Sequence, residues 1–361
     1  MNEDERFMAA ALTLARRVDT AAPNPRVGAL VVVDGEVVGE GFHAGAGRPH
    51  AEREALRAAG PRASGATMYV TLEPCTVTGR TPPCAPAVVA AGIARVVVAM
   101  EDPDERVSGS GIAHLEDHGV EVELGVLEEE ARRLNDAYVH HRSTGRPLVT
   151  LKLALSVDGR MAAPDGTSRW ITSEETRRRV HLARSRAAAV LVGAGTVVND
   201  DPELTAREVP VSRQPLRIVV DSRGAVSPHA RIFSSAAGTL VATTDRTSHE
   251  VQTAWKEAGA EVVVLPLDDE GVDLDALVQE LGRRELLDVL CEGGGRLATS
   301  LLRLDLVDRL EAHVAPVLIG DGGVALGDLR VSTMSDAPRW ETLTVERSGP
   351  DAVLVLARQD R

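Results

Sequence analysis

The chain has 361 residues, which at about 150 residues per domain predicts two or three domains. Its formal net charge of −14 excludes a general nucleic-acid binder, because phosphate contacts need clustered lysines and arginines. No apolar run reaches the roughly 18 residues of a membrane helix, and the acidic first residues lack the features of a signal peptide. We therefore expect a cytoplasmic protein with neither a nucleic-acid nor a membrane partner.

The first elements of the chain alternate between helix and strand. Residues from about Asp4 to Arg17 place Phe7, Ala11 and Leu14 at helical spacing and predict a packed helix. Residues 26–41 then predict two strands joined at an Asp-Gly turn, which is a strong hairpin signal. The alternation continues to about residue 145 and indicates a layered α/β domain, whose site we expect at strand ends and helix starts.

Four residues of this first domain suit a catalytic metal. His50 opens a predicted helix, Cys75 follows a predicted strand, and Cys84 opens another helix after two prolines. One imidazole and two thiolates suit zinc and leave a fourth position for a water molecule, whose pKa the metal lowers. Glu52, two residues after His50, is the carboxylate that we expect to carry protons rather than bind the metal.

This arrangement predicts hydrolytic chemistry. H-x-E followed by P-C-x-x-C is a zinc deaminase signature, although here the second cysteine comes nine positions after the first. Three alternatives stay open: two buried thiols beside a surface histidine, iron in place of zinc, and a structural zinc staple beside a nucleotide-sensing domain. The staple is disfavoured because structural zinc sites usually have four protein ligands.

A short polar segment, Ser143–Pro147, is the best domain boundary. After it, an apolar strand begins near Leu148, and a helix is predicted to be capped near Thr172 or Ser173. Further apolar strands are predicted at residues 187–193, 216–222, 238–244, 260–266 and 286–295. The second half is therefore also predicted to be α/β.

Two glycine clusters follow strands of this second half. One contains Gly193 and Gly195, and the other contains Gly293, Gly294 and Gly295. Glycines between a strand and a helix let backbone amides approach a pyrophosphate, so both clusters favour nucleotide binding. Packing or tight turns remain the alternative, since neither cluster is a GxGxxG motif.

Taken together, these motifs resemble those of the bifunctional riboflavin-biosynthesis deaminase/reductase family. PHAE with EPC…GRTPPC resembles the deaminase half, and KxAxSxDG, S-x-WIT, GxxTVxxDDPxLT and EGG resemble the reductase half. The resemblance implies a cytidine-deaminase-like three-layer α/β domain over residues 1–145 and a dihydrofolate-reductase-like α/β domain over residues 146–361. It also implies zinc-dependent deamination of a phosphoribosylamino-pyrimidine, followed by NADPH-dependent reduction of its ribosyl group to ribityl.

The resemblance assigns roles to individual residues. In the deaminase half it implies zinc ligands at His50, Cys75 and Cys84, a proton shuttle at Glu52, and substrate contacts at Asn24, His43 and Arg80. In the reductase half it implies cofactor contacts at Ala154, Trp170, Thr196, Asp200, Ser222, Gly294, Gly295, Arg296, Leu297, Ala298 and Thr299. It implies substrate contacts there at Ser168, Arg184, Leu204, Arg207 and Glu292.

Asp200 is also the expected catalytic residue of the reductase half, because a carboxylate could steady a developing iminium charge or relay a proton. Taken alone, three of these residues have simpler explanations: Asn24 as a turn before proline, Asp200 as a turn or N-cap, and Trp170 as a core residue.

Two stretches depart from the family pattern. The family has Ser-His-x-Gly-Lys/Arg where this chain has Thr76, Val77 and Thr78 before its glycine, and Asp-Pro-Asn where it has Asp104 in the third place. The alternative function is therefore a paralogue that acts on a related pyrimidine in a specialised pathway. In either case we expect a homo-oligomer with a small phosphorylated pyrimidine as its partner.

Overall fold

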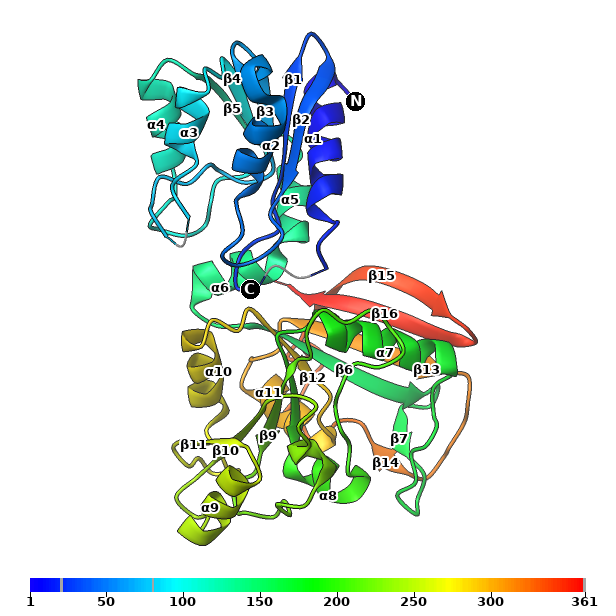
Figure 1. The fold of residues 1–361 in the computed structure, drawn as a ribbon. Coiled ribbons are helices and arrows are strands. Elements are labelled where there is room, and N and C mark those ends of the chain that lie inside the picture. The colour runs from blue at the N-terminus through cyan, green and yellow to red at the C-terminus, as the bar shows by residue number, and fades with distance from the viewer. Residues whose placement is uncertain (20–21, 80, 360–361) are drawn as a thin grey trace. The chain divides into compact units, whose positions relative to one another are not determined.

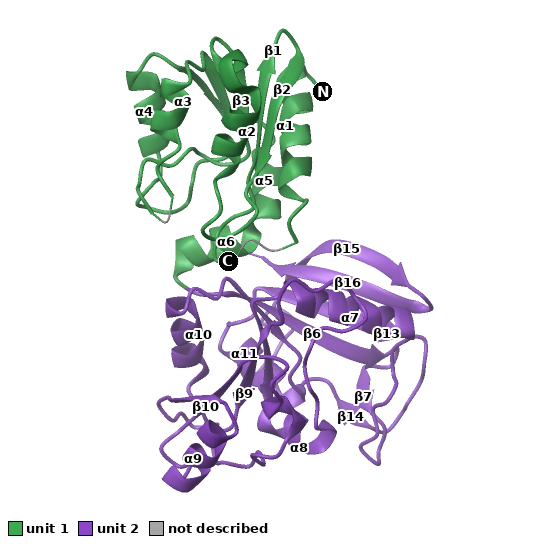
Figure 2. Ribbon diagram, viewed as in Figure 1, with its two compact units in different colours: residues 1–145 green, residues 146–361 purple. Residues whose placement is uncertain are grey.

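The computed structural model describes residues 1–19, 22–79 and 81–359. The chain forms two compact units, unit 1 over Met1–Gly145 and unit 2 over Arg146–Arg361, which are coloured separately in Figure 2. Both units are α/β, as the sequence predicts.

Unit 1 is built on a five-stranded sheet of order β2-β1-β3-β4-β5, labelled in Figure 1. Strand β1 is antiparallel to β2 and β3, whereas β3, β4 and β5 run parallel to one another. The strands are β1 (Gly28–Val33), β2 (Glu36–Phe42), β3 (Thr67–Val70), β4 (Arg95–Val98) and β5 (Glu121–Leu124). The helices are α1 (Glu3–Ala15), α2 (Ala51–Ala59), α3 (Ala85–Ala90), α4 (Ser110–Asp117), α5 (Glu128–Leu134) and α6 (Asp136–Thr144), with a 3₁₀ turn at Gly60–Ala63.

Helices cover both faces of this sheet because glycines let them approach. A Cβ atom on Gly28 would lie 2.1 Å from the carbonyl oxygen of Ala11 in α1. On β2, a Cβ atom on Gly41 would lie 2.1 Å from the carbonyl oxygen of Ala51 in α2. Gly28 and Gly41 belong to successive residue pairs of the β1–β2 ladder, whose side chains point to opposite faces. The unit therefore has three layers.

Two predicted local features of unit 1 are confirmed. Asp34 and Gly35 form the two-residue hairpin turn with φ angles of 48° and 78°, which is the left-handed geometry that Asp-Gly favours. His50 is the N-cap residue of α2, and Gly60 ends that helix with a φ of 56°.

Unit 2 contains a nine-stranded sheet of order β11-β10-β9-β8-β12-β6-β13-β16-β15. All neighbours from β11 to β13 are parallel, and β16 and β15 are added antiparallel. The strands of this sheet are β6 (Leu148–Ser156), β8 (Ala189–Gly193), β9 (Leu216–Val220), β10 (Thr239–Thr243), β11 (Glu261–Val264), β12 (Asp288–Cys291), β13 (Arg309–Ala315), β15 (Trp340–Ser348) and β16 (Asp351–Arg358). A small second sheet pairs β7 (Arg160–Ala162) with β14 (Gly323–Val324).

The helices of unit 2 connect these parallel strands. They are α7 (Glu174–Arg186), α8 (Ala194–Asp200), α9 (His249–Glu257), α10 (Leu274–Arg283) and α11 (Gly295–Arg303), with a 3₁₀ turn at Arg231–Phe233. Ser173 is the N-cap of α7, as the sequence predicts. Since the strands are parallel, their carboxyl ends lie at one edge of the sheet, where ligands of such folds bind.

Each unit has its own apolar core, with one cluster of buried side chains in unit 1 and two in unit 2 over the described part of the chain. Among the residues that the structure describes, no helix is long and apolar enough to cross a bilayer.

Candidate active sites

The three predicted metal ligands lie together in unit 1. The ligand atoms of His50, Cys75 and Cys84 all lie within 4.8 Å of one another. The Nδ1 atom of His50 is 3.6 Å from the Cys75 sulfur and 3.4 Å from the Cys84 sulfur. Tetrahedral zinc with its usual bond lengths would separate such a nitrogen and sulfur by about 3.6 Å. The spacing of these donors therefore fits zinc.

The elements that carry these ligands explain the convergence. His50 caps α2 and Cys84 caps α3, so both ligands stand at helix N-termini. Cys75 follows β3 and is joined to Cys84 through the backbone, since its carbonyl oxygen accepts the amides of Cys84 and Ala85, each at 3.0 Å.

The electrostatics of the cluster favour thiolate. A hydrogen bond from Cys84 lowers the pKa of Cys75 to about 4, and His50 adds to the effect. In return, that hydrogen bond and burial raise the pKa of Cys84. The bond to Cys75 also raises the pKa of His50. The contact between the two sulfurs thus favours a thiolate, which is the form of cysteine that binds a metal.

Glu52 lies beside this cluster with only 4% of its surface exposed. Burial raises its pKa above the usual value, although nearby His50 opposes the shift. Its carboxyl group is close enough to His50, Cys75 and Cys84 for all three to influence its pKa. A raised pKa suits a carboxyl group to donate a proton as well as to accept one.

Two of the three predicted substrate contacts of unit 1 adjoin the same cluster. The Asn24 amide nitrogen is 2.8 Å from Nε2 of His43, and the His43 ring meets the His50 ring edge to face with centroids 5.2 Å apart. Nδ1 of His43 is 3.1 Å from the Pro49 carbonyl oxygen, so this nitrogen carries the proton while Nε2 accepts from Asn24. Burial lowers the pKa of His43, which fits the neutral ring. Arg80, the third predicted contact, lies outside the described residues.

In unit 2, many predicted site residues follow the carboxyl ends of parallel strands. Thr196 follows β8, Ser222 follows β9, and Glu292 and Gly294 follow β12. Ala154 lies within the neighbouring strand β6. These strands are adjacent in the order β9-β8-β12-β6, so the residues lie along one edge of the sheet. This edge is where an open parallel sheet binds a nucleotide.

The glycines of the second cluster have different explanations. A Cβ atom on Gly293 would lie 2.7 Å from Leu297, and one on Gly295 would lie 2.8 Å from the Ala325 carbonyl oxygen, so packing accounts for both. At Gly294 the nearest atom would be the Thr196 hydroxyl oxygen at 3.8 Å. Gly294 is the N-cap of α11 and leaves room for a ligand to approach the backbone, which fits a nicotinamide cofactor.

Some of the predicted cofactor contacts on α11 have side chains that pack in the core of unit 2. The Leu297 and Ala298 side chains belong to the core of unit 2, whereas Arg296 is exposed. The Thr299 hydroxyl donates to the Gly295 carbonyl oxygen at 2.5 Å and accepts the Gly327 amide at 2.7 Å. Only the backbone of Leu297 and Ala298 is therefore left to contact a ligand.

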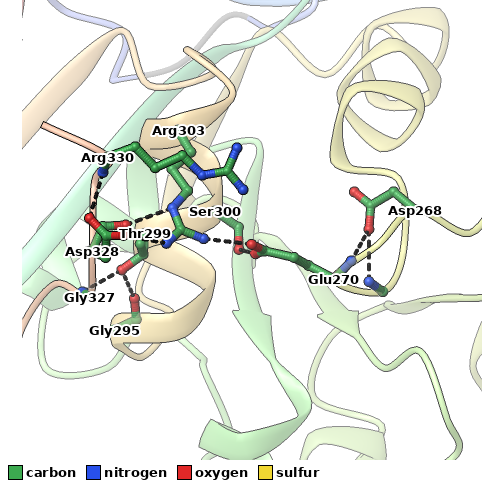
Figure 3. Close-up of polar contacts among 10 residues, drawn as sticks. Asp268, Glu270, Gly295, Thr299, Ser300, Arg303, Gly327, Asp328 and Arg330 are labelled. Atoms are coloured by element: carbon green, nitrogen blue, oxygen red, sulfur yellow. Dashed lines mark hydrogen bonds and ion pairs between the residues drawn. The ribbon is translucent and has the colours of Figure 1, made fainter.

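A pocket of about 600 Å³ lies along α11. The Glu270 carboxylate in its lining accepts hydrogen bonds from Ser300 at 2.6 Å and from Arg303 at 2.5 Å, which are drawn as dashed lines in Figure 3. Three of the predicted cofactor contacts line this pocket. Its lining consists of Glu270, Gly295, Arg296, Thr299, Ser300, Arg303, Val324 and Gly327.

Two predicted substrate contacts of unit 2 form an ion pair. Arg184 of α7 binds Glu292 through two hydrogen bonds of 2.6 Å and 3.0 Å, and the two side chains are 12% and 9% exposed. Burial alone would raise the pKa of Glu292, but the Arg184 charge lowers it to about 2. Arg184 also donates to the Thr205 carbonyl oxygen at 3.1 Å, which ties the pair to the predicted contacts Leu204 and Arg207.

The predicted substrate contacts Leu204, Arg207 and Ser168 differ in how far they are exposed to solvent. Leu204 is 3% exposed and packs in a core cluster of unit 2, and its backbone has a φ of 52°. Arg207 is half exposed and bonds the Thr205 hydroxyl at 3.3 Å. Ser168 is half-buried in the segment that precedes α7.

Asp200 and the segment that contains Trp170 are linked by a hydrogen bond. Arg169 donates to the Asp200 carbonyl oxygen at 2.7 Å, which brings the neighbouring Trp170 to the end of α8. Trp170 is 68% exposed, and the Arg177 guanidinium lies 4.5 Å from its ring centroid, so the core alternative for this tryptophan is wrong. Asp200 is the last residue of α8 and not an N-cap, and its side chain is exposed.

Lys152 was not predicted as a site residue, although its environment is unusual. It lies on β6, where burial lowers its pKa and Glu292 opposes the shift. The signal in the sequence was a lysine within an otherwise apolar strand, in a chain that has only two lysines. Its charge interacts electrostatically with both members of the Arg184–Glu292 ion pair.

Comparisons with known proteins agree with both halves. A profile of the cytidine and deoxycytidylate deaminase zinc-binding region matches residues 1–100, and a profile of the RibD C-terminal domain matches residues 147–354. The riboflavin biosynthesis protein RibD of Aquifex aeolicus is 42% identical over 356 residues, which cover 98% of each chain. The solved structure of Acinetobacter baumannii RibD, form 1, is similar with a TM-score of 0.91 and 37% identity over 99% of each chain.

A third relative is a solved structure from Thermotoga maritima. It is a diaminohydroxyphosphoribosylaminopyrimidine deaminase/5-amino-6-(5-phosphoribosylamino)uracil reductase. It is 34% identical to this chain, with a TM-score of 0.86 over 99% of each chain.

The folds and sites thus define a two-domain enzyme, with an N-terminal zinc-dependent deaminase of the cytidine deaminase type and a C-terminal reductase of the dihydrofolate-reductase-like type. The chain belongs to the RibD family of bifunctional deaminase/reductases of riboflavin biosynthesis. His50, Cys75 and Cys84 form its zinc site, and the reductase domain uses NAD(P)H.

Proposed function

We propose that unit 1 removes an exocyclic amine from a phosphoribosylamino-pyrimidine by hydrolysis, and that unit 2 then reduces the ribosyl group to ribityl with NADPH. The observation that carries the first half is a buried carboxyl group, Glu52, beside three zinc-ligand atoms. The substrate and the order of the steps follow the two activities of the Thermotoga maritima relative.

In unit 1, zinc supplies a lowered pKa for the attacking water. Glu52 takes the proton of that water and returns it to the departing amine, for which its burial and raised pKa suit it. Asn24 and His43 hold the pyrimidine ring through amide and imidazole groups that already pair with each other. Arg80 meets the ribose phosphate.

In unit 2, NADPH supplies hydride to the sugar carbon. Asp200 steadies the charge that develops while the ribose ring opens, and its exposed carboxylate at the end of α8 is free to approach a ligand. Ser168, Leu204 and Arg207 hold the substrate beside the Arg184–Glu292 pair. Bound cofactor would be held along the strand ends by Ala154, Trp170, Thr196, Ser222 and residues 294–299.

The substitution Glu52→Gln tests the deaminase half. It removes the proton carrier but no ligand, so we expect zinc content to stay at the wild-type level and ammonia release to fall by about 10² to 10⁴. Zinc is measured by atomic emission and ammonia by a coupled assay. Glu54→Gln is the matched control, because Glu54 lies on the same helix and pairs with the exposed Arg57.

The result separates three interpretations. Loss of deamination with zinc retained rejects a purely structural zinc. Loss of the metal together with the activity would make Glu52 a ligand and contradict the proposed shuttle.

We also propose that the enzyme acts in the cytoplasm as a homo-oligomer. Its three free cysteines, two of them zinc ligands, suit a reducing compartment. The oligomeric state is measured by sedimentation of the zinc-loaded protein.

A further inference from the structure

The zinc ligand His50 has a second ring nitrogen, and that nitrogen has a partner of its own. Nδ1 of His50 faces the two ligand sulfurs, while Nε2 lies 3.0 Å from the hydroxyl oxygen of Thr81. Among the described residues, no other polar atom is hydrogen-bonded to Nε2. Thr81 is 31 positions away in the chain and lies in the loop between the two cysteines.

The chemistry of imidazole fixes the direction of this bond. A ligand nitrogen must present a lone pair to the metal, so with Nδ1 as the ligand the single ring proton is on Nε2. Nε2 therefore donates and the Thr81 hydroxyl accepts. Such a bond holds both the tautomer and the plane of the ring, and its loss elsewhere typically weakens metal binding about 10- to 100-fold.

Both partners of the bond are themselves held in place. His50 is fixed as the N-cap of α2, and Thr81 is followed by two prolines, which restrict the backbone up to Cys84. Arg53 of α2 also reaches the Pro83 carbonyl oxygen at 3.4 Å, which connects the helix and the loop a second time. Thr81 is half-buried, so water competes poorly for the bond.

We propose that Thr81 is a positioning residue, which orients His50 for zinc through its hydroxyl group. The inference rests on the proposed function only in taking zinc as the metal. It adds a supporting contact from the loop to the site without adding a fourth ligand.

The test compares Thr81→Val, which keeps the shape and removes the hydroxyl, with Thr81→Ser, which keeps the hydroxyl. Thr78→Val is the matched control, because Thr78 is an exposed threonine of the same loop. Zinc affinity of the full-length chain is measured by competition with a chromophoric chelator. Nitrogen NMR of the zinc-loaded protein reports the protonation of His50 Nε2, and circular dichroism checks that each variant is folded.

We expect Thr81→Val to bind zinc about 10- to 100-fold more weakly and to lose the protected Nε2 proton signal. Thr81→Ser and Thr78→Val should both bind zinc like the wild type. Equal affinity and an unchanged signal in folded Thr81→Val would overturn the inference and leave the proposed deaminase intact. A wild-type chain that binds no zinc would overturn the proposed function and this inference with it.

Discussion

Asp104 stands where the family pattern has an amide, and its additional negative charge is balanced locally. Its carboxylate lies 2.6 Å from Arg106 and 3.4 Å from Arg142. The hydrogen bond from Arg106 is the main reason that its pKa falls to about 2. Its neighbour Asp102 is the opposite case, since burial raises its pKa to about 6 while the Tyr138 hydroxyl donates to it. The departure from the family pattern is therefore accommodated by two arginines.

The ion pair between Arg184 and Glu292 gives a prediction about stability. Glu292→Gln leaves a nearly buried guanidinium without its counter-charge, which we expect to lower the free energy of unfolding by about 3 kcal/mol at pH 7. Glu346→Gln is the control, because its partner Arg179 and Glu346 itself are 31% and 45% exposed and exposed pairs contribute less than about 1 kcal/mol. Urea unfolding of both variants measures the difference.

The same pair also predicts a pH dependence. The folded pKa of Glu292, about 2, lies below the ordinary value of 4.5, so its contribution is present above pH 4.5 and is lost as the pH falls towards 2. The difference between the wild type and Glu292→Gln should shrink over that range. A difference that is the same at about pH 7 and about pH 3 would contradict the assignment.

The sequence could predict which residues bind zinc, because histidine and cysteine are its usual ligands and all three stand at helix starts or strand ends. It could not predict the bond of Thr81 to His50, since a hydroxyl group in a loop has no pattern of its own. Lys152 was missed for a related reason. An apolar strand predicts burial, but the presence of Arg184 and Glu292 near this lysine depends on tertiary packing.

At the scale of elements, the contact of α1 with β1 depends on a residue without a side chain. Gly28→Ala would place a methyl group 2.1 Å from the Ala11 carbonyl oxygen, a backbone atom that cannot move without shifting α1. We expect unit 1 to lose about 1–3 kcal/mol, the usual range for overpacking. Its thermal midpoint should fall by several degrees, measured by circular dichroism.

Gly79→Ala is the matched control, because a Cβ atom there would have no neighbour within 4 Å. Its midpoint should stay close to the wild-type value. If Gly28→Ala is as stable as this control, α1 does not pack on β1 as described.

Elements were predictable where local chemistry decides them. The Asp34-Gly35 turn, the N-cap Ser173 and the apolar strands of unit 2 each have a local signal. The strand order of the nine-stranded sheet has no local signal in the sequence, because β6 pairs with β12 and β13, which come more than 130 residues later in the chain. Strand pairing over such separations depends on which faces pack together in the folded unit.

At the scale of the whole molecule, the zinc ligands belong to unit 1 and the strand-end residues belong to unit 2. Removing zinc with a strong chelator should therefore abolish ammonia release and leave NADPH oxidation with the deaminated substrate unchanged. Restoring zinc should restore deamination. A parallel loss of both activities would contradict the assignment of one activity to each unit.

The same assay tests the paralogue alternative. The untreated enzyme should release ammonia from the flavin precursor and then consume NADPH. If it consumes NADPH only with a precursor that is already deaminated, unit 1 is either impaired or acts on a different pyrimidine, and Val77 and Asp104 are the residues to exchange first.

The loop between the two ligand cysteines is closed at its base by the backbone bond from Cys84 to Cys75, while Val77 and Thr78 in its middle are exposed. Substitutions at these two exposed positions should therefore leave the metal-binding scaffold intact. A combinatorial library at these two positions should retain its metal in most members and yield enzymes with changed substrate preference, which makes the segment a starting point for engineering deaminases.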